Sequence, residues 1–127
     1  MSRVGPYQLI RPLASGGMGQ VYLASLVREG GFEKWVALKR IRPDLSKNTH
    51  FTDMFEREAR LAATLSHQHI IQIYDFGRYQ ESAWLAMEYL LGVDLRKVIE
   101  EAIEGHLPPL PIVCAVGLAC ARALDYA

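Results

Sequence analysis

The sequence predicts an α+β fold, with a five-stranded antiparallel sheet, one helix packed on the sheet and two further helices after it. The composition is 50% hydrophobic and 22% charged over 127 residues, which suits a globular domain with a core of its own. The patterns run in the order strand, strand, strand, helix, strand, strand, helix, helix. Because the helices do not alternate with the strands, we expect an antiparallel sheet followed by a separate helical part.

Three strands are predicted in the first third of the chain, over Tyr7–Leu13, Gln20–Val27 and Trp35–Ile41. They are rich in β-branched and aromatic residues, as half-buried strands are. A glycine-rich stretch separates the first two, and Arg28–Lys34, with its glycine pair and charges, separates the second from the third.

The middle of the chain predicts a helix over Phe51–Leu65 and a hairpin of two strands, Ile70–Phe76 and Ala83–Tyr89. The turn-length connection Gly77–Ser82 favours antiparallel pairing of these strands. The helix prediction relies on apolar residues at helical spacing. These residues are Phe51, Phe55, Ala59, Ala62 and Leu65.

Two helices are expected at the end of the chain, over Leu95–Glu104 and Ile112–Ala127, with Gly105–Pro111 as the linker. The second helix is apolar almost all round, so it needs cover on every side. Each large aliphatic side chain left in water forfeits roughly 1.5–3 kcal/mol. The sequence therefore predicts a piece of a longer protein, or a chain that needs a partner.

Charge and hydropathy exclude several classes of protein. Acidic and basic residues number 14 each, without the basic excess of nucleic-acid binders. The most apolar run, Ile112–Ala121, is shorter than the roughly 20 residues that cross a bilayer, and the N-terminus lacks a signal-peptide core. Cys114 and Cys120 are six residues apart on a predicted helix, which favours two buried thiols over a disulfide. We therefore expect a cytoplasmic protein without a membrane segment or nucleic-acid partner.

The stretch LASGGMGQVYLA (Leu13–Ala24) places three glycines in four positions. Glycine lets backbone N–H groups approach phosphate oxygens. A Walker-type loop is excluded because Gln20 and Val21 follow the last glycine in place of Lys and Ser or Thr. A dinucleotide-binding loop is disfavoured because the following residues are strand-like and do not open a helix. A plain hairpin and a flap over a nucleotide remain equally favoured by this stretch alone.

Four motifs together resemble the N-terminal part of eukaryotic-type serine/threonine protein kinases, in particular the bacterial ones. They are LASGGMGQVYLA, VALK (Val36–Lys39), FEREARLAATLSHQHIIQIYDFG (Phe55–Gly77) and LAMEYLLGVDL (Leu85–Leu95). They cover essentially the whole chain in the family's order. The resemblance implies a kinase small lobe over residues 1–90, and the hinge exit and first helices of an incomplete large lobe over 91–127.

The resemblance implies that Lys39 holds the α- and β-phosphates of ATP and that a glutamate of the following helix positions it. Glu58 lies nineteen positions after Lys39 and, on helical spacing, shares the apolar face of its helix, whereas Glu56 is expected to point away. A glutamate on a core-facing stripe is costly unless it is paired. We therefore expect a Lys39–Glu58 ion pair.

The resemblance also implies an adenine pocket, with Leu13 and Val21 over the ring and Ala37 above it. Met87 takes the position that gates the back of the pocket, Glu88 and Leu90 offer backbone groups, and Asp94 either meets the ribose or caps a helix. The remaining residues implied in nucleotide binding belong to the covering loop. They are Ala14, which replaces the first glycine of the family's loop, Ser15, Gly16, Gly17, Met18, Gly19 and Gln20.

The family's catalytic and Mg²⁺-binding motifs do not follow in this sequence. No His-Arg-Asp-type loop or Asp-Phe-Gly follows the hinge, and the Asp75-Phe76-Gly77 triplet precedes it, so we reject that triplet as the metal motif. The Mg²⁺ ligands are thus expected beyond Ala127, and the chain alone is predicted to be inactive. The complete kinase would phosphorylate a protein substrate. The alternative is a non-catalytic kinase-like fragment that binds ATP or a partner, and a nucleotide binder outside the family is disfavoured.

Overall fold

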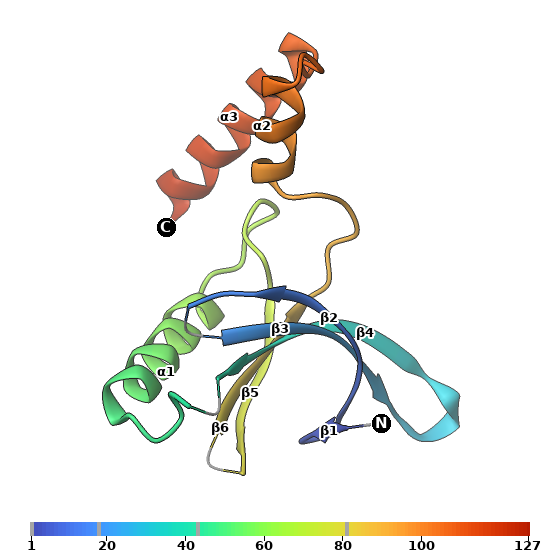
Figure 1. Ribbon diagram of the computed structural model, residues 1–127, viewed down its shortest axis with the longest axis vertical. Helices are drawn as coiled ribbons and strands as arrows, with labels where there is room; N and C mark the ends of the chain where they lie inside the picture. Colours follow the sequence, from blue (N-terminus) through green and yellow to red (C-terminus); the bar gives the residue numbers. More distant parts are fainter. Residues whose placement is uncertain (1, 18, 43, 81) are drawn as a thin grey trace. The chain divides into compact units, whose positions relative to one another are not determined.

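The computed structural model describes residues 2–17, 19–42, 44–80 and 82–127 and confirms the α+β fold (Figure 1). The strands are β1 Arg3–Val4, β2 Tyr7–Ser15, β3 Gly19–Val27, β4 Glu33–Ile41, β5 Ile73–Tyr79 and β6 Ser82–Glu88. The helices are the short 3₁₀ turn η1 Glu29–Gly31 and the α-helices α1 Thr49–Ala63, α2 Leu95–Ile103 and α3 Leu110–Tyr126. The expected count of five strands was one too low, because the two residues of β1 are too few for a sequence pattern.

The sheet is antiparallel throughout, as predicted, with its six strands in the order β1-β2-β3-β4-β6-β5. The expected loop Gly77–Ser82 is wrong at both ends, because β5 continues to Tyr79 and β6 already begins at Ser82. Gly77 lies inside β5 opposite Trp84, and a Cβ there would overlap with the indole ring. The glycine therefore marks a close approach between side chain and backbone, and not a turn.

Helix α1 starts two residues before the predicted start, after an N-cap. The Asn48 side chain accepts a hydrogen bond from the backbone N–H of His50 at 3.0 Å, which satisfies one of the free donors of the first turn. The following strand begins at Ile73, three residues later than predicted, and the segment His67–Ile70 is a turn.

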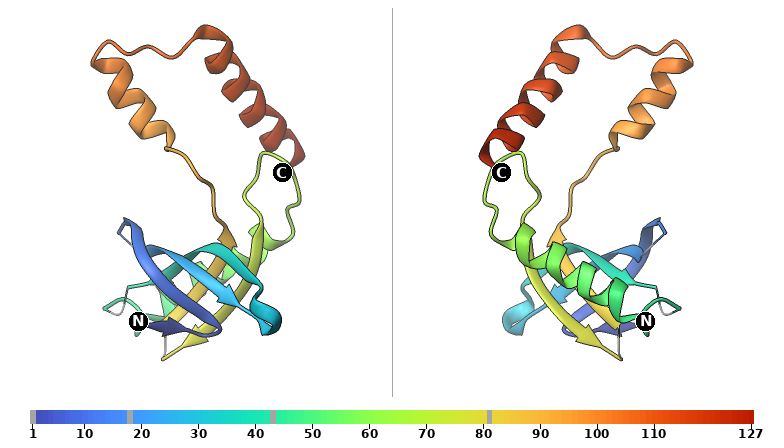
Figure 2. Two further views of the ribbon diagram at one scale, coloured as in Figure 1. Left: turned by 90° about the vertical axis from the view of Figure 1, so that its right-hand side faces the viewer. Right: turned by 90° about the vertical axis from the view of Figure 1, so that its left-hand side faces the viewer.

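Two apolar clusters lie on the two faces of the sheet, because successive side chains of a strand point to opposite sides. The first cluster comprises Val4, Tyr7, Ala24, Val36, Leu38, Trp84 and Ala86. The second comprises Ile41, Phe55, Ala59, Ala83 and Leu85. Helix α1 contributes to the second cluster and lies beside β5 and β6 (Figure 2). We call the two faces of the sheet the Trp84 face, which carries the first cluster, and the Lys39 face, which carries the second cluster and the Lys39 side chain.

The chain divides into two compact units, Met1–Ser66 with Ile71–Tyr89 and His67–Ile70 with Leu90–Ala127. In the second unit, α2 and α3 are described in full and contain no buried residue. The apolar side chains predicted for the last helix are thus largely exposed, with Leu124 77% accessible. Cys114 and Cys120 are exposed as well, so the expectation of buried thiols was wrong: it assumed that the helix would be covered. Over the described residues, none of the helices combines the length and hydropathy needed to cross a membrane.

Candidate functional site

Lys39 lies near the C-terminal end of β4, and its ammonium faces helix α1. The Lys39 Nζ is 3.5 Å from Glu58 Oε1 and 5.6 Å from the centroid of the Phe55 ring. The ladder sets Lys39 opposite Val21 on one side and Leu85 on the other. The Lys39 side chain is 26% exposed and that of Glu58 is 56% exposed. Lysine has three donors, so a single carboxylate at this distance leaves hydrogen-bonding capacity on an accessible cation.

Glu56 does not point away from the protein, contrary to the sequence prediction. Its side chain is only 17% exposed, and Arg78 of β5 donates to its Oε1 through Nε at 2.9 Å and through Nη2. The buried residues of α1 are Thr52, Phe55 and Ala59. The prediction that Glu58 lies on the core-facing side was wrong as well, because its side chain is 56% exposed. Both errors have one cause: the predicted buried face relied partly on Leu65, which lies beyond the helix end.

Val21, Ala37 and Met87 share the Lys39 face, as the ladder shows. Val21 is directly opposite Lys39, and Ala37 is directly opposite Met87. Directly opposed residues of an antiparallel pair point to the same side of the sheet. Uncharged apolar side chains thus line the sheet next to Lys39, the only lysine that the described strand β4 places on this face.

The glycine-rich stretch forms the connection between β2 and β3. The Gly16 N–H donates to the Gly19 carbonyl at 2.9 Å, and Ser15 pairs with Gln20. A Cβ on Gly19 would lie 2.8 Å from the Arg40 carbonyl oxygen, so this glycine permits close strand packing. A Cβ on Gly17 would meet nothing within 4 Å, so the backbone there is open.

The remaining residues of the predicted site lie in several places. Met18 is outside the described residues. Ala14 pairs with Val21, and Leu13 is the extra residue of a bulge between Pro12 and Ala14. The Glu88 N–H donates to the Gln72 carbonyl at 2.9 Å, so any role for Glu88 toward a ligand falls to its carbonyl.

Two predicted residues, Leu90 and Asp94, belong to the second unit. Asp94 is the N-cap of α2, and its Oδ1 accepts from the Lys97 N–H at 2.9 Å. The N-cap alternative for Asp94 is therefore confirmed. Leu90 is 63% exposed.

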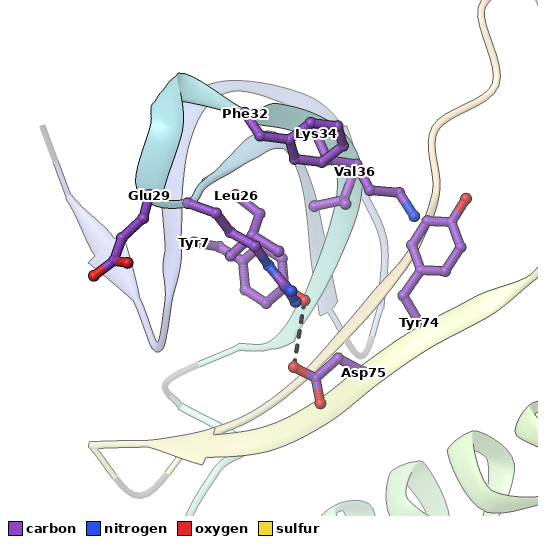
Figure 3. Close-up of a pocket in the computed structure, with 9 residues that line it drawn as sticks. Tyr7, Leu26, Glu29, Phe32, Lys34, Val36, Tyr74 and Asp75 are labelled. Atoms are coloured by element: carbon purple, nitrogen blue, oxygen red, sulfur yellow. Dashed lines mark hydrogen bonds between the residues drawn. The ribbon is translucent and has the colours of Figure 1, made fainter.

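A cavity of about 490 Å³ opens on the other side of the sheet, in a region that no sequence motif indicated (Figure 3). The Tyr7 hydroxyl donates to Asp75 Oδ2 at 3.3 Å, and the Lys34 ammonium lies 3.4 Å from the centroid of the Tyr74 ring. Burial, together with the negative charge of Asp75, raises the pKa of Tyr7 to about 12. Val36 lines this cavity and belongs to the Trp84 face, so the cavity is separate from the Lys39 site.

Comparison with known proteins identifies the family to which the chain is similar. The protein kinase domain family matches residues 7–118. The tyrosine-protein kinase MasK of Myxococcus xanthus is 44% identical over 124 residues, which is 97% of this chain and 19% of that protein. The serine/threonine-protein kinase PknI of Mycobacterium tuberculosis is 37% identical over 121 residues, which is 95% of this chain and 20% of that protein.

Solved structures give the same result. One crystal structure of the M. tuberculosis PknI kinase domain matches with a TM-score of 0.76 and 34% identity, over 98% of this chain and 49% of that one. Another crystal structure of this domain matches with a TM-score of 0.74 and 35% identity, over 95% of this chain and 47% of that one. The chain thus spans about a fifth of these curated relatives and about half of the solved kinase domains.

Proposed function

Because the chain belongs to the protein kinase domain family, we propose that it is the ATP-binding part of a serine/threonine protein kinase. Such an enzyme transfers a phosphoryl group from ATP to a protein hydroxyl. The observation that carries the proposal is the Lys39–Glu58 pair at 3.5 Å, on the same face as Val21 and next to the glycine-rich connection.

The described residues fit the phosphates of a nucleotide. Lys39 is a partly exposed cation with donors to spare. Glu58 contacts its ammonium and leaves it accessible to solvent. The open backbone at Gly17 allows main-chain N–H groups to approach an anion. Lys39 would contact the α- and β-phosphates, and the loop from Ala14 to Gln20 would cover them. Mg²⁺, when bound with ATP, supplies charge neutralisation at the phosphates, and we expect its ligands outside these residues.

The adenine ring would lie against the apolar part of the same face. Val21, Ala37 and Met87 supply an apolar surface without charge. In this proposal Leu13 covers the ring and the Glu88 carbonyl binds its edge, and the family resemblance further implies a role for the Leu90 N–H at that edge. The family resemblance implies that Asp94 would meet the ribose, and its Oδ1 is engaged as the N-cap of α2.

A binding measurement with matched lysine variants tests the proposal. Lys34 lies on the same strand as Lys39, but its side chain points to the other face of the sheet, where its ammonium lies over the Tyr74 ring. A charged hydrogen bond contributes about 1.5–3 kcal/mol, so Lys39→Ala should weaken binding of a fluorescent ATP analogue by about tenfold or more. Lys34→Ala should leave the affinity within about twofold, since it lies away from this face. Equal affinities for the parent chain and Lys39→Ala would overturn the proposal.

Phosphoryl transfer is a separate expectation. We expect no transfer of label from γ-labelled ATP to a protein by this chain alone, because it carries no catalytic aspartate after the hinge. Transfer that disappears with Lys39→Ala would contradict the predicted inactivity. Identification of the labelled amino acids would then decide between serine/threonine and tyrosine specificity, since PknI is named a serine/threonine kinase and MasK a tyrosine kinase.

Cytoplasmic location is part of the proposal and is tested by cell fractionation.

A further inference from the structure

Helix α1 is joined to the sheet by two carboxylates that reach different strands. Glu58 faces Lys39 of β4, and Glu56 faces Arg78 of β5. The two glutamates are about 3 Å apart along the helix axis and about 200° apart around it. The helix is therefore held at two points, one on each side of its apolar face.

The two ion pairs differ in strength. The Lys39–Glu58 pair is a single contact of 3.5 Å whose carboxylate is 56% exposed, and water weakens such pairs. Glu56 is 17% exposed, and two donors of the Arg78 guanidinium converge on its Oε1, while Arg60 Nη2 lies 3.8 Å from its Oε2. A carboxylate removed from water depends on its cationic partner. The Arg78–Glu56 pair is thus the stronger attachment.

The apolar contacts of α1 do not fix its rotation by themselves. Phe55 packs on Phe76 of β5 with ring centroids 6.3 Å apart, and Ala59 lies in the same cluster. Apolar attraction is non-directional, so these contacts specify the rotation of the helix less sharply than a hydrogen bond does. The bond from Arg78 to Glu56 is directional. Because the helix is rigid over two residues, any rotation of α1 that breaks the Arg78–Glu56 bond also moves Glu58.

We propose that Arg78 is a positioning residue: by holding Glu56, it holds α1 at the rotation that presents Glu58 to Lys39. Its effect on nucleotide affinity rests on the proposed function, whereas its effect on the Lys39–Glu58 geometry does not. Arg78 itself is 60% exposed on β5 and touches α1 through Glu56. The strand thereby acts on the phosphate-binding lysine through two side chains of one helix.

The test reads the Lys39 ammonium directly by NMR in a chain with isotopically labelled lysine. The sequence has four lysines, so the spectrum is sparse, and Lys39→Ala assigns the signal. The Glu58→Gln variant supplies the reference for a broken pair. Arg78→Gln should shift the Lys39 signal toward this reference and weaken nucleotide binding by about three- to tenfold. Arg78→Lys, which keeps the cation but loses the two guanidinium donors, should fall between the parent chain and Arg78→Gln in both measurements.

Arg60→Gln is the matched control, because Arg60 faces the same carboxylate from 82% exposure and a longer distance. It should change affinity by less than about twofold. Should Arg78→Gln fail to fold, Glu56→Gln takes its place, since it leaves no desolvated carboxylate unpaired, and it should shift the Lys39 signal in the same direction. A folded variant without the Arg78–Glu56 pair whose Lys39 signal matches the parent chain overturns the inference. A shifted Lys39 signal in a chain that binds no nucleotide supports the inference and contradicts only the proposed function.

Discussion

The two faces of the sheet are built from the same strands and differ in what they expose. On the Trp84 face, β4 and β6 contribute Val36, Leu38, Trp84 and Ala86, all buried and apolar. On the Lys39 face the alternate residues include a charged side chain, which a carboxylate of α1 meets. In the middle of β4 and β6 the difference shows how strand alternation separates two tasks: Val36, Leu38, Trp84 and Ala86 supply packing, and the alternate positions place a cation beside apolar neighbours.

The largest expected effect comes from Trp84→Ala, which tests whether the Trp84 face serves stability alone. Trp84 is 5% exposed and packs edge-on against Tyr7, with ring centroids 5.3 Å apart and an interplanar angle of 70°. Removing a buried aromatic ring costs about 3–5 kcal/mol of the free energy of unfolding. Urea unfolding followed by circular dichroism measures the loss.

If the two faces have separate tasks, the loss of stability in Trp84→Ala should leave the Lys39 site intact. Nucleotide affinity of folded Trp84→Ala, measured well below its unfolding midpoint, should match that of the parent chain. An affinity loss as large as that of Lys39→Ala would show that the two faces are coupled. Trp84→Phe is the milder control, because it keeps an aromatic ring and removes the indole N–H that lacks a partner among the described residues.

Leu85→Ala makes the opposite test one residue further along β6. Leu85 is also 5% exposed, but it lies opposite Lys39 and in the cluster beneath α1. Its truncation should cost about 2–5 kcal/mol, and less than Trp84→Ala because fewer atoms are removed. Unlike Trp84→Ala, it should also weaken nucleotide binding, since the space that it vacates lies under Lys39 and α1. Unchanged affinity in Leu85→Ala, measured by the same fluorescent analogue, would contradict the assignment of function to this face.

Sequence pattern predicted much of this arrangement, because alternation in a strand is a local property. Ala37 and Lys39 share a face by parity, and an antiparallel sheet followed from the order of elements. The sequence pattern gave wrong predictions where the role of a residue depends on a partner distant in the sequence. Gly77 was taken for a turn because only the Trp84 ring, seven residues later, explains it. Glu56 was placed outside because its partner, Arg78, comes from another strand.

Tyr7→Phe has the smallest expected effect at neutral pH, and it sharpens the comparison through a pH dependence of the Trp84 face. Burial and the Asp75 carboxylate raise the pKa of Tyr7 from 10.0 to about 12, so the folded chain keeps this proton where the unfolded chain releases it. The resulting stabilisation is fully present below pH 10 and is lost as the pH rises toward 12. The difference in unfolding free energy between the parent chain and Tyr7→Phe should therefore shrink or reverse over this range.

Other groups titrate in the same range, and the comparison with Tyr7→Phe removes their contribution because they are common to both chains. Asp75→Asn is the companion variant, since it keeps an acceptor for the Tyr7 hydroxyl and removes the charge that opposes ionisation. It should keep part of the pH dependence, because burial of Tyr7 at 3% exposure remains. Urea unfolding at about pH 8, 10 and 11 measures all three chains. Parallel curves for the parent chain and Tyr7→Phe would show that Tyr7 ionises as freely as in the unfolded chain, and that the Trp84 face is more open to water than its packing indicates.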